Sequence, residues 1–125
     1  MPGKRKQPDP SLPSEAQAKR FDLLSPMLES LYTEIKDLSK KDARTVVNEL
    51  KIKMINRILV EIKNTLGADP SVEFLDILSE QSLPLTSDAV LILSQFKAAM
   101  AQFKEKHFVY DQEEVEHRWL TQENP

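Results

Sequence analysis

The sequence predicts an all-α protein, a single bundle of four main helices that cross either orthogonally or in up-down order. Large apolar side chains recur at intervals of three and four residues over three long stretches, as on one face of a helix. No stretch alternates for long between apolar and polar residues, as a half-buried strand would. The chain has 125 residues, of which 40% are hydrophobic and 30% charged, which suits one core and is too short for two.

The first helix is expected to begin at Ser14, because Ser14 and Gln17 have the spacing of a capping box. An unbroken apolar stripe follows, formed by Phe21, Leu24, Leu28, Leu31, Ile35 and Leu38 and widened by Leu23, Met27 and Tyr32. Pro26 interrupts this segment, since proline has no backbone N–H to donate. Either the helix kinks there, or Ser25 caps a second helix. The constant phase of the stripe favours the kink.

The second helix should run from near Asp42 to Leu66. Its apolar residues fill a broad arc, which indicates the central helix of the bundle. Gly67 suits the position just after a helix, and Pro70 prevents the helix from continuing. Lys51 falls inside the apolar arc. We therefore expect its side chain to reach out along a boundary or to pair with an acidic residue across an interface.

A short third helix is expected after Asp69, which would cap it with Pro70 in the first helical position. Its apolar residues are Val72, Phe74, Leu75, Ile77 and Leu78. Residues 82–87 have the composition of a connector. Thr86 or Ser87 should then cap the fourth helix. Its apolar face is formed by Leu93, Phe96, Met100 and Phe103.

The C-terminal end is expected to form a short capping helix, because Asp111 and Glu114 repeat the capping-box spacing. Trp119 should fold back from this helix onto the bundle, since a domain of this size needs its large apolar groups for the core. The alternative is that Arg118, Trp119 and Leu120 form a partner-binding segment, because tryptophan and arginine are common anchors of interfaces. Closure of the bundle is the favoured interpretation.

Residues 1–13 are expected to form a flexible, basic tail, since they hold four of the eight prolines and few large apolar side chains. The bundle domain then covers residues 14–120, and residues 121–125 form a C-terminal tail. The N-terminal tail contains a basic cluster, Lys4, Arg5 and Lys6. Such a cluster can contact phosphates or act as a nuclear address, but three basic residues are also common at a solvated terminus.

The second helix offers two further bases to a nucleic acid, Lys53 and Arg57, on the side opposite its apolar arc. Together with the basic tail they could grip a phosphate backbone. The chain as a whole is acidic, with 17 Lys and Arg against 20 Asp and Glu, and it has no helix-turn-helix signature. A solvated outer face is therefore the favoured interpretation of these bases.

Composition excludes several function classes. With no cysteine there are no disulfides, zinc ribbons, iron–sulfur clusters or thiol nucleophiles. With only two glycines, phosphate-cradling loops and nucleophile elbows cannot be built. No apolar run reaches the about 20 residues of a membrane span, and no signal-peptide core stands near residue 1, so we expect a cytoplasmic protein without membrane contact. No catalytic residue, cofactor or metal-ligand set is assigned.

His107 lies in phase with the apolar face of the fourth helix. If that helix ran on, Glu114 and His117 would have the spacing of half a di-metal carboxylate motif. Such a site needs two of these motifs, and the chain has only two histidines. A mononuclear metal site near His107 remains an alternative, and a boundary residue that bonds a carbonyl group or water is favoured.

These features favour a small non-enzymatic protein–protein interaction module, acting as an adaptor, regulator or complex subunit. Its partner would be another protein or a second copy of the chain, since the apolar stripe of the first helix also suits dimerisation. One alternative is a nucleic-acid-associated accessory protein that uses the basic tail and the second helix. The second alternative is an enzyme or binding protein with a mononuclear metal near His107. The choice rests mainly on the classes that composition excludes.

Overall fold

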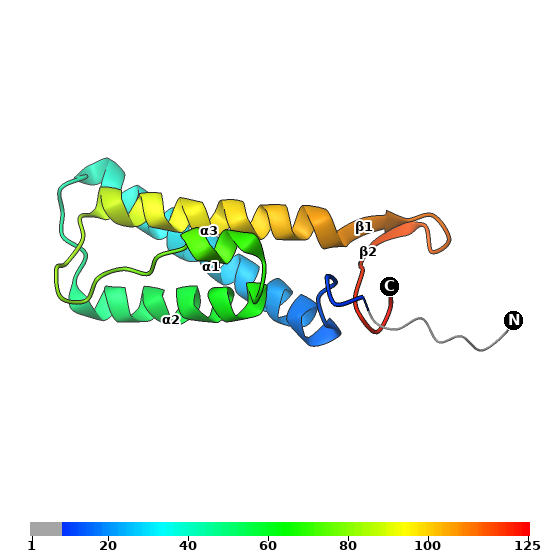
Figure 1. The fold of residues 1–125 in the computed structure, drawn as a ribbon. Coiled ribbons are helices and arrows are strands. Elements are labelled where there is room, and N and C mark those ends of the chain that lie inside the picture. Colours follow the sequence, from blue (N-terminus) through cyan, green and yellow to red (C-terminus); the bar gives the residue numbers. More distant parts are fainter. Residues whose placement is uncertain (1–8) are drawn as a thin grey trace, which may run out of the picture.

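Three long helices and a small β-hairpin make up the part of the chain that this computed structural model describes, residues 9–125 (Figure 1). The elements in chain order are α1 (Glu15–Lys41), α2 (Glu49–Leu66), the 3₁₀ turn η1 (Pro70–Phe74), α3 (Thr86–His107), β1 (Phe108–Asp111) and β2 (Glu116–Trp119). The expected bundle of four main helices is therefore wrong in two places. The turn η1 stands where the third helix was expected, and the hairpin stands where the C-terminal helix was expected.

The first helix begins where the sequence predicts. The backbone N–H of Gln17 donates to Ser14 Oγ (3.1 Å), and the backbone N–H of Ser14 donates to Gln17 Oε1 (2.8 Å). One helix continues through Pro26, so a second helix capped by Ser25 does not form. Both other long helices pack mainly against α1 and little against each other. The central helix is therefore α1, and the expectation that the second helix is central is wrong.

The second helix begins later than expected, because the residues before it pair with the start of α3. The backbone N–H of Val47 donates to the carbonyl of Pro84 (2.9 Å), and that of Thr86 donates to the carbonyl of Thr45 (2.8 Å). β-Branched residues such as these favour extended backbone. The side chain of Asn48 then caps the first turn of α2. Pairing with a distant segment thus outweighs the helical pattern in this stretch.

The signals that end α2 are confirmed. Gly67 ends the helix with φ of 58°, a backbone conformation that glycine adopts without strain. The Asp69 side chain accepts a hydrogen bond from the backbone N–H of Ser71 (3.0 Å), and Pro70 is the first residue of η1. Only one 3₁₀ turn follows this cap.

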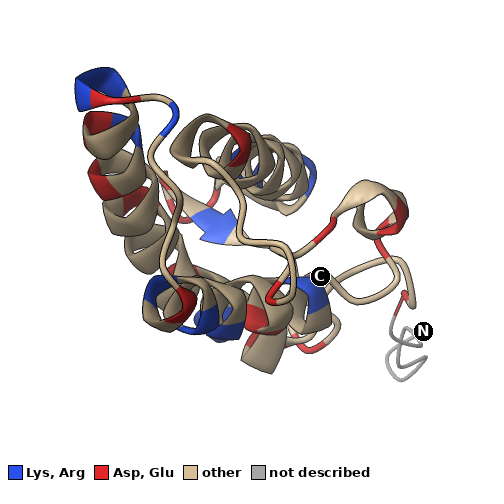
Figure 2. Cartoon of the chain, turned by 90° about the vertical axis from the view of Figure 1, so that its left-hand side faces the viewer, with Lys and Arg blue, Asp and Glu red and all other residues tan. Residues whose placement is uncertain are grey.

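Residues 75–85, which we call the strap, leave η1 in non-helical conformation and run back to the start of α3. Leu75 and Leu78 are buried in the core, whereas Phe74 and Ile77 are 74% and 43% exposed. These apolar residues therefore do not share one helix face. Figures 1 and 2 show η1 and α1 on opposite sides of the pair formed by α2 and α3.

Asn56 holds the strap in place from the middle of α2. Its side chain is buried, with Nδ2 donating to the Leu78 carbonyl (2.8 Å) and Oδ1 accepting from the Leu78 backbone N–H (2.9 Å). One turn before the end of α2, Lys63 Nζ donates to the Leu75 carbonyl (2.8 Å). Backbone groups of Leu75 and Leu78, which would bond along a helix, are thus bonded to side chains of α2, which explains how these two residues can be buried without helical structure.

The C-terminal segment forms a hairpin although it carries a helix-capping pattern. The Asp111 carboxylate accepts hydrogen bonds from the backbone N–H groups of Glu113 (2.9 Å) and Glu114 (3.3 Å). The same bonds stabilise an Asx turn, and here the chain reverses at Val115, which has φ of 53°. β1 and β2 then pair antiparallel, with Phe108 opposite Trp119. The local pattern fits both outcomes, and the aromatic contacts of this pair favour the hairpin.

The two ends of the described chain lie together (Figure 1). The backbone N–H of Gln122 donates to the carbonyl of Pro13 (2.9 Å), and its side chain donates to the carbonyl of Leu12 (2.9 Å). Pro13 and Thr121 are buried. Residues 9–13 are therefore packed against the C-terminal segment, where the sequence predicted two separate tails. Within residues 9–125, no helix combines the length and apolar character that a membrane crossing needs.

We predict that Asn56→Ala lowers the free energy of unfolding by about 2–4 kcal/mol, because it leaves both backbone groups of Leu78 buried without partners. Asn64→Ala is the matched control on the same helix, since Asn64 is exposed, and its effect should stay within about 0.5 kcal/mol. Urea unfolding followed by circular dichroism measures both values. Equal stability of the two variants would contradict the role given to Asn56.

Candidate functional site

The basic residues suggested for nucleic-acid binding do not form a free cationic surface in the described chain. Lys53 is paired with Glu49 (3.3 Å), and Arg57 lies one turn further along α2. Lys4, Arg5 and Lys6 lie outside the described residues. Figure 2 shows acidic and basic positions next to one another on the helices. Lys51, expected at a boundary, is half-buried and has no ion pair within residues 9–125.

Trp119 closes the end of the bundle from a strand. Its ring is half-buried and packs edge-to-face on Phe21, with 5.0 Å between ring centroids, and near Phe103 at 6.2 Å. The indole Nε1 donates to Asp22 Oδ2 (3.1 Å). The position agrees with a role in closing the bundle, although a helix was expected to bring the ring there.

Arg118 and Leu120, the neighbours of Trp119, are also bonded within the chain. Arg118 Nε donates to Asp111 Oδ2 (2.6 Å), and its Nη1 donates to the carbonyl of Asn124 (2.7 Å). The hydrogen bond from Arg118, together with two backbone N–H groups, lowers the pKa of Asp111. The backbone N–H of Leu120 donates to the carbonyl of His107 (2.7 Å). Partner binding by this segment stays a prediction, since its polar groups already hold the hairpin.

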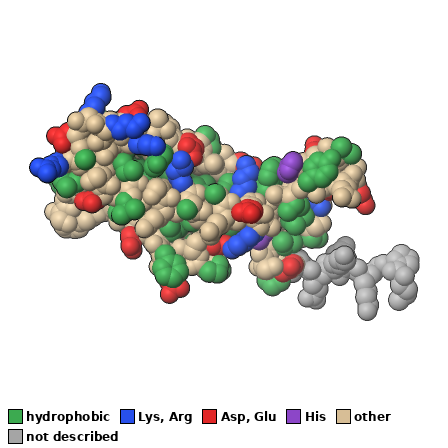
Figure 3. Space-filling model, turned by 90° about the horizontal axis from the view of Figure 1, so that it is seen from above, with side chains coloured by type: hydrophobic (Ala, Val, Ile, Leu, Met, Phe, Trp, Pro, Cys, Tyr) green, Lys and Arg blue, Asp and Glu red, His purple; other side chains and the backbone are tan. Residues whose placement is uncertain are grey.

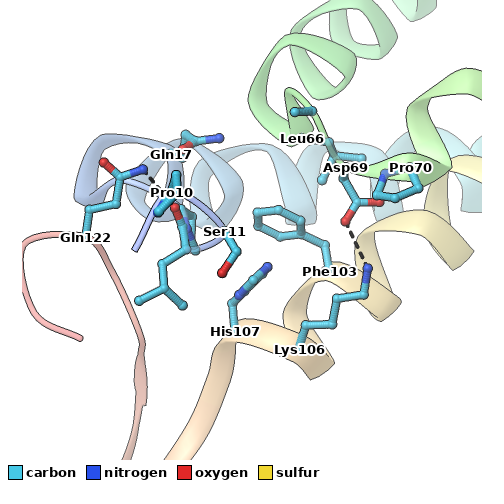
Figure 4. Close-up of a pocket in the computed structure, with 13 residues that line it drawn as sticks. Pro10, Ser11, Gln17, Leu66, Asp69, Pro70, Phe103, Lys106, His107 and Gln122 are labelled. Carbon is cyan, nitrogen blue, oxygen red and sulfur yellow. Dashed lines mark hydrogen bonds and ion pairs between the residues drawn. The ribbon is translucent and has the colours of Figure 1, made fainter. Parts of the chain in front are cut away.

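A cleft of about 450 Å³ lies where the two ends of the chain meet α3 (Figure 4). Its walls come from the N-terminal segment, the ends of α2 and α3, η1 and the C-terminal segment. The His107 ring packs edge-to-face on Phe103, 4.8 Å between centroids, and its Nδ1 is buried without a hydrogen-bond partner among the described residues. Lys106 at the rim is paired with Asp69 (3.1 Å). One cation and one anion thus offset each other in this cleft.

The His107 cleft favours an uncharged imidazole. Burial lowers the pKa of His107, and the positive charge of Lys106 lowers it further, while Asp69 acts in the opposite direction. The pKa of Asp69 is also lowered. Burial acts to raise it, but hydrogen bonds from Ser71 and the ammonium group of Lys106 outweigh burial.

The arrangement around His107 does not resemble a metal centre. In the described part of the chain, no three histidine or carboxylate side chains lie close enough to hold one ion. Among the residues that line the cleft, only His107 and Asp69 are of ligand type. His117 lies on the hairpin, stacked near Phe108 (5.7 Å), so the helix that would have placed His117 beside Glu114 does not form.

A second cavity, about 820 Å³, is larger than the His107 cleft and forms a groove between α1 and α2 that the sequence did not predict. We call it the α1/α2 groove. Its apolar wall is formed by Leu23, Leu24, Pro26, Met27, Leu31, Met54 and Ile58. Arg20, Ser30, Arg57 and Glu61 complete it. A signal was present in the sequence, since Leu23 and Met27 widen the stripe of α1 beyond what one core contact needs.

Large apolar side chains in the α1/α2 groove remain open to solvent. Leu23 is 60% exposed, Met27 43% and Met54 58%, while Leu24 beneath them is buried. At one end, Arg20 of α1 forms an ion pair with Glu61 of α2. Seen from the α3 side, by contrast, many apolar side chains lie scattered between charged ones over the bundle, and others gather on the hairpin (Figure 3). The α1/α2 groove therefore combines a cavity with several exposed large apolar side chains.

We predict that the stability of the protein falls on acidification from pH 7 to pH 5 in a manner that depends on His107. The pKa of His107 in the folded protein lies below its ordinary value of 6.5. As the pH falls below 6.5, the imidazole is therefore protonated in the unfolded chain before it is protonated in the folded protein. The free energy of unfolding decreases over this range, until the pH has fallen through the folded-state pKa. In His107→Gln the part of this decrease that is due to His107 should be absent, so the free energy of unfolding should fall less steeply between pH 6.5 and pH 5. Urea midpoints measured from pH 7.5 to pH 5 compare the two proteins, and identical slopes would contradict the prediction.

Comparison with known proteins gives no guide to this site. No protein-family model, curated protein sequence or solved structure matches the chain significantly. The α1/α2 groove is the feature of the described residues that best suits binding of another molecule.

Proposed function

We propose that this chain is a small non-enzymatic protein–protein interaction module, an adaptor, regulator or complex subunit, that binds its partner in the α1/α2 groove. The observation that supports it most is the exposure of Leu23, Met27 and Met54 around one cavity. Single exposed apolar side chains are common on protein surfaces, but a contiguous apolar groove rimmed by polar residues is typical of an interaction site.

The side chains of the α1/α2 groove suit a protein partner. Methionine is flexible and polarisable, so Met27 and Met54 can adapt to the side chains of an occupant. The floor and walls are helix faces, and the ion pair between Arg20 and Glu61 links the two helices at one end. An occupant would thus meet a surface that is already formed, which lowers the entropy lost on binding.

We further propose that the protein works in the cytoplasm. It contains no cysteine, so it neither needs nor uses the oxidising conditions in which disulfides form. A partner would accordingly be a cytoplasmic protein.

We predict that Leu23→Glu abolishes partner capture and leaves the fold intact. A carboxylate in the α1/α2 groove would be desolvated by an apolar occupant, and binding should fall about tenfold or more. Leu91→Glu is the matched control, because Leu91 on α3 is equally exposed, 60% for both, and lies outside the groove. Stability of each variant should change by no more than about 0.5 kcal/mol.

The measurement is affinity capture from a lysate of the native host with wild type, Leu23→Glu and Leu91→Glu as baits, followed by quantitative mass spectrometry. A partner of the groove is retained by wild type and Leu91→Glu and lost with Leu23→Glu. If every captured protein binds the three baits equally, the groove is not the interaction site.

A further inference from the structure

We infer that the α1/α2 groove takes one amphipathic helix, and that this helix carries an acidic side chain next to Arg57. The inference rests on the proposed function, because it names the kind of partner that would fill the same groove. The length of the groove, the hydrogen-bonded backbone of its helical walls and the charges on its rim point to such a helix.

The length of the groove suits two to three turns of helix. On α1 the lining extends from Arg20 to Leu31, about 16 Å at the rise of an α-helix, and on α2 from Met54 to Glu61, about 10 Å. Side chains at positions i, i+4 and i+7 of a helix span about 10 Å along its axis. One apolar face of an occupant helix therefore covers the wall formed by Leu23, Met27 and Met54.

The walls of the groove favour a helix over an extended peptide. Without the edge of a sheet to pair with, an extended peptide leaves the backbone N–H and C=O groups that face an apolar wall without partners. Both walls here are α-helices, whose backbone groups bond along each helix except at Pro26, which has no N–H to donate, so neither wall offers a row of free backbone groups as a sheet edge does. Only an occupant that satisfies its own backbone groups, as a helix does, avoids this cost.

The charges on the rim favour an acidic residue in the occupant. Arg20 is paired with Glu61, but Arg57 makes no hydrogen bond or ion pair with any residue from 9 to 125. A guanidinium group binds a carboxylate through two parallel hydrogen bonds. A helix lying in the groove would partly desolvate Arg57, so a carboxylate beside it offsets that cost and a lysine there would add to it.

Two other occupants fit the rim less well. A nucleic acid would need several free cations, and the groove offers Arg57 alone beside the carboxylate of Glu61 and an apolar wall. If two copies packed groove against groove, the carboxylate among the lining residues that could face Arg57 of the other copy would be that of Glu61. Glu61 is already paired with Arg20. An acidic helix of a different protein satisfies both the apolar wall and Arg57.

The test is a displayed library of helical 16-residue peptides with one face randomised, selected against the wild-type protein. We expect enriched peptides to carry large apolar residues at i, i+4 and i+7 and Asp or Glu on one flank. The best peptide is then synthesised with Glu or with Lys at that flank. Wild type should bind the Glu peptide about tenfold more tightly, and Arg57→Glu should reverse the preference, as measured by fluorescence polarisation.

Lys53→Glu is the matched control for Arg57→Glu. Lys53 stands one turn away on α2 and does not line the groove, so a carboxylate of the occupant beside Arg57 does not contact it, and its reversal should change either affinity by less than about twofold. Thermal unfolding of both variants checks that the fold is kept. The proposal of an acidic partner would be wrong if wild type bound the Glu and Lys peptides equally tightly. It would also be wrong if Lys53→Glu changed the preference as much as Arg57→Glu does.

The outcomes separate the inference from the proposed function. If the selected peptides lose affinity for Leu23→Glu but bind Arg57→Glu as well as wild type, the groove is still an interaction site. The proposal that its occupant carries an acidic residue would then be wrong. Enrichment of Lys or Arg on that flank would also overturn the inference. Salt-dependent binding of a DNA duplex that Arg57→Glu abolishes would replace it with nucleic acid, and a dimer in light scattering that Leu23→Glu dissociates would replace it with a second copy.

Discussion

The buried side chain of Asn56 bonds both backbone groups of Leu78, and this contact decides how the core is completed. Leu75 and Leu78 occupy the core where a fourth helix would otherwise pack. A strap without regular structure has many backbone groups to satisfy, and the amide of Asn56 supplies a donor and an acceptor at the point where the strap is most buried. The three long helices can thus enclose one core without a fourth.

The position of the strap also determines which surface stays open. The turn η1 and the strap lie on one side of the pair formed by α2 and α3, and α1 lies on the other (Figures 1 and 2). The outer edge between α1 and α2 is then covered by no other element of the described chain, and Leu23, Met27 and Met54 remain exposed there. The α1/α2 groove is therefore a consequence of completing the core from the opposite side.

The end of the bundle near the two chain ends is stabilised by aromatic packing. Phe21 stacks on Phe103 (5.7 Å between centroids), and Trp119 covers both from the hairpin. The polar groups of this region are mostly bonded within the chain, including the Lys106 ammonium and the Arg118 guanidinium. The His107 cleft beside this cluster holds two side chains of metal-ligand type, and its charges are balanced, so the more open α1/α2 groove is the better candidate for recognition.

The sequence by itself determined the features that depend on neighbours along the chain. The capping box at Ser14, the buried stripe of α1 and the end of α2 at Gly67 follow from spacing and backbone preference. Tertiary structure decided the rest. The hydrogen bonds that Asp111 accepts in this turn are of the kind that an aspartate also accepts at the start of a helix, so they do not distinguish the two structures. The contact of Trp119 with Phe21 favours the hairpin. The sequence shows that the apolar stripe of α1 is wide. Which side of this stripe stays exposed to solvent is decided only by packing, because it depends on where the strap, distant in sequence, binds α2.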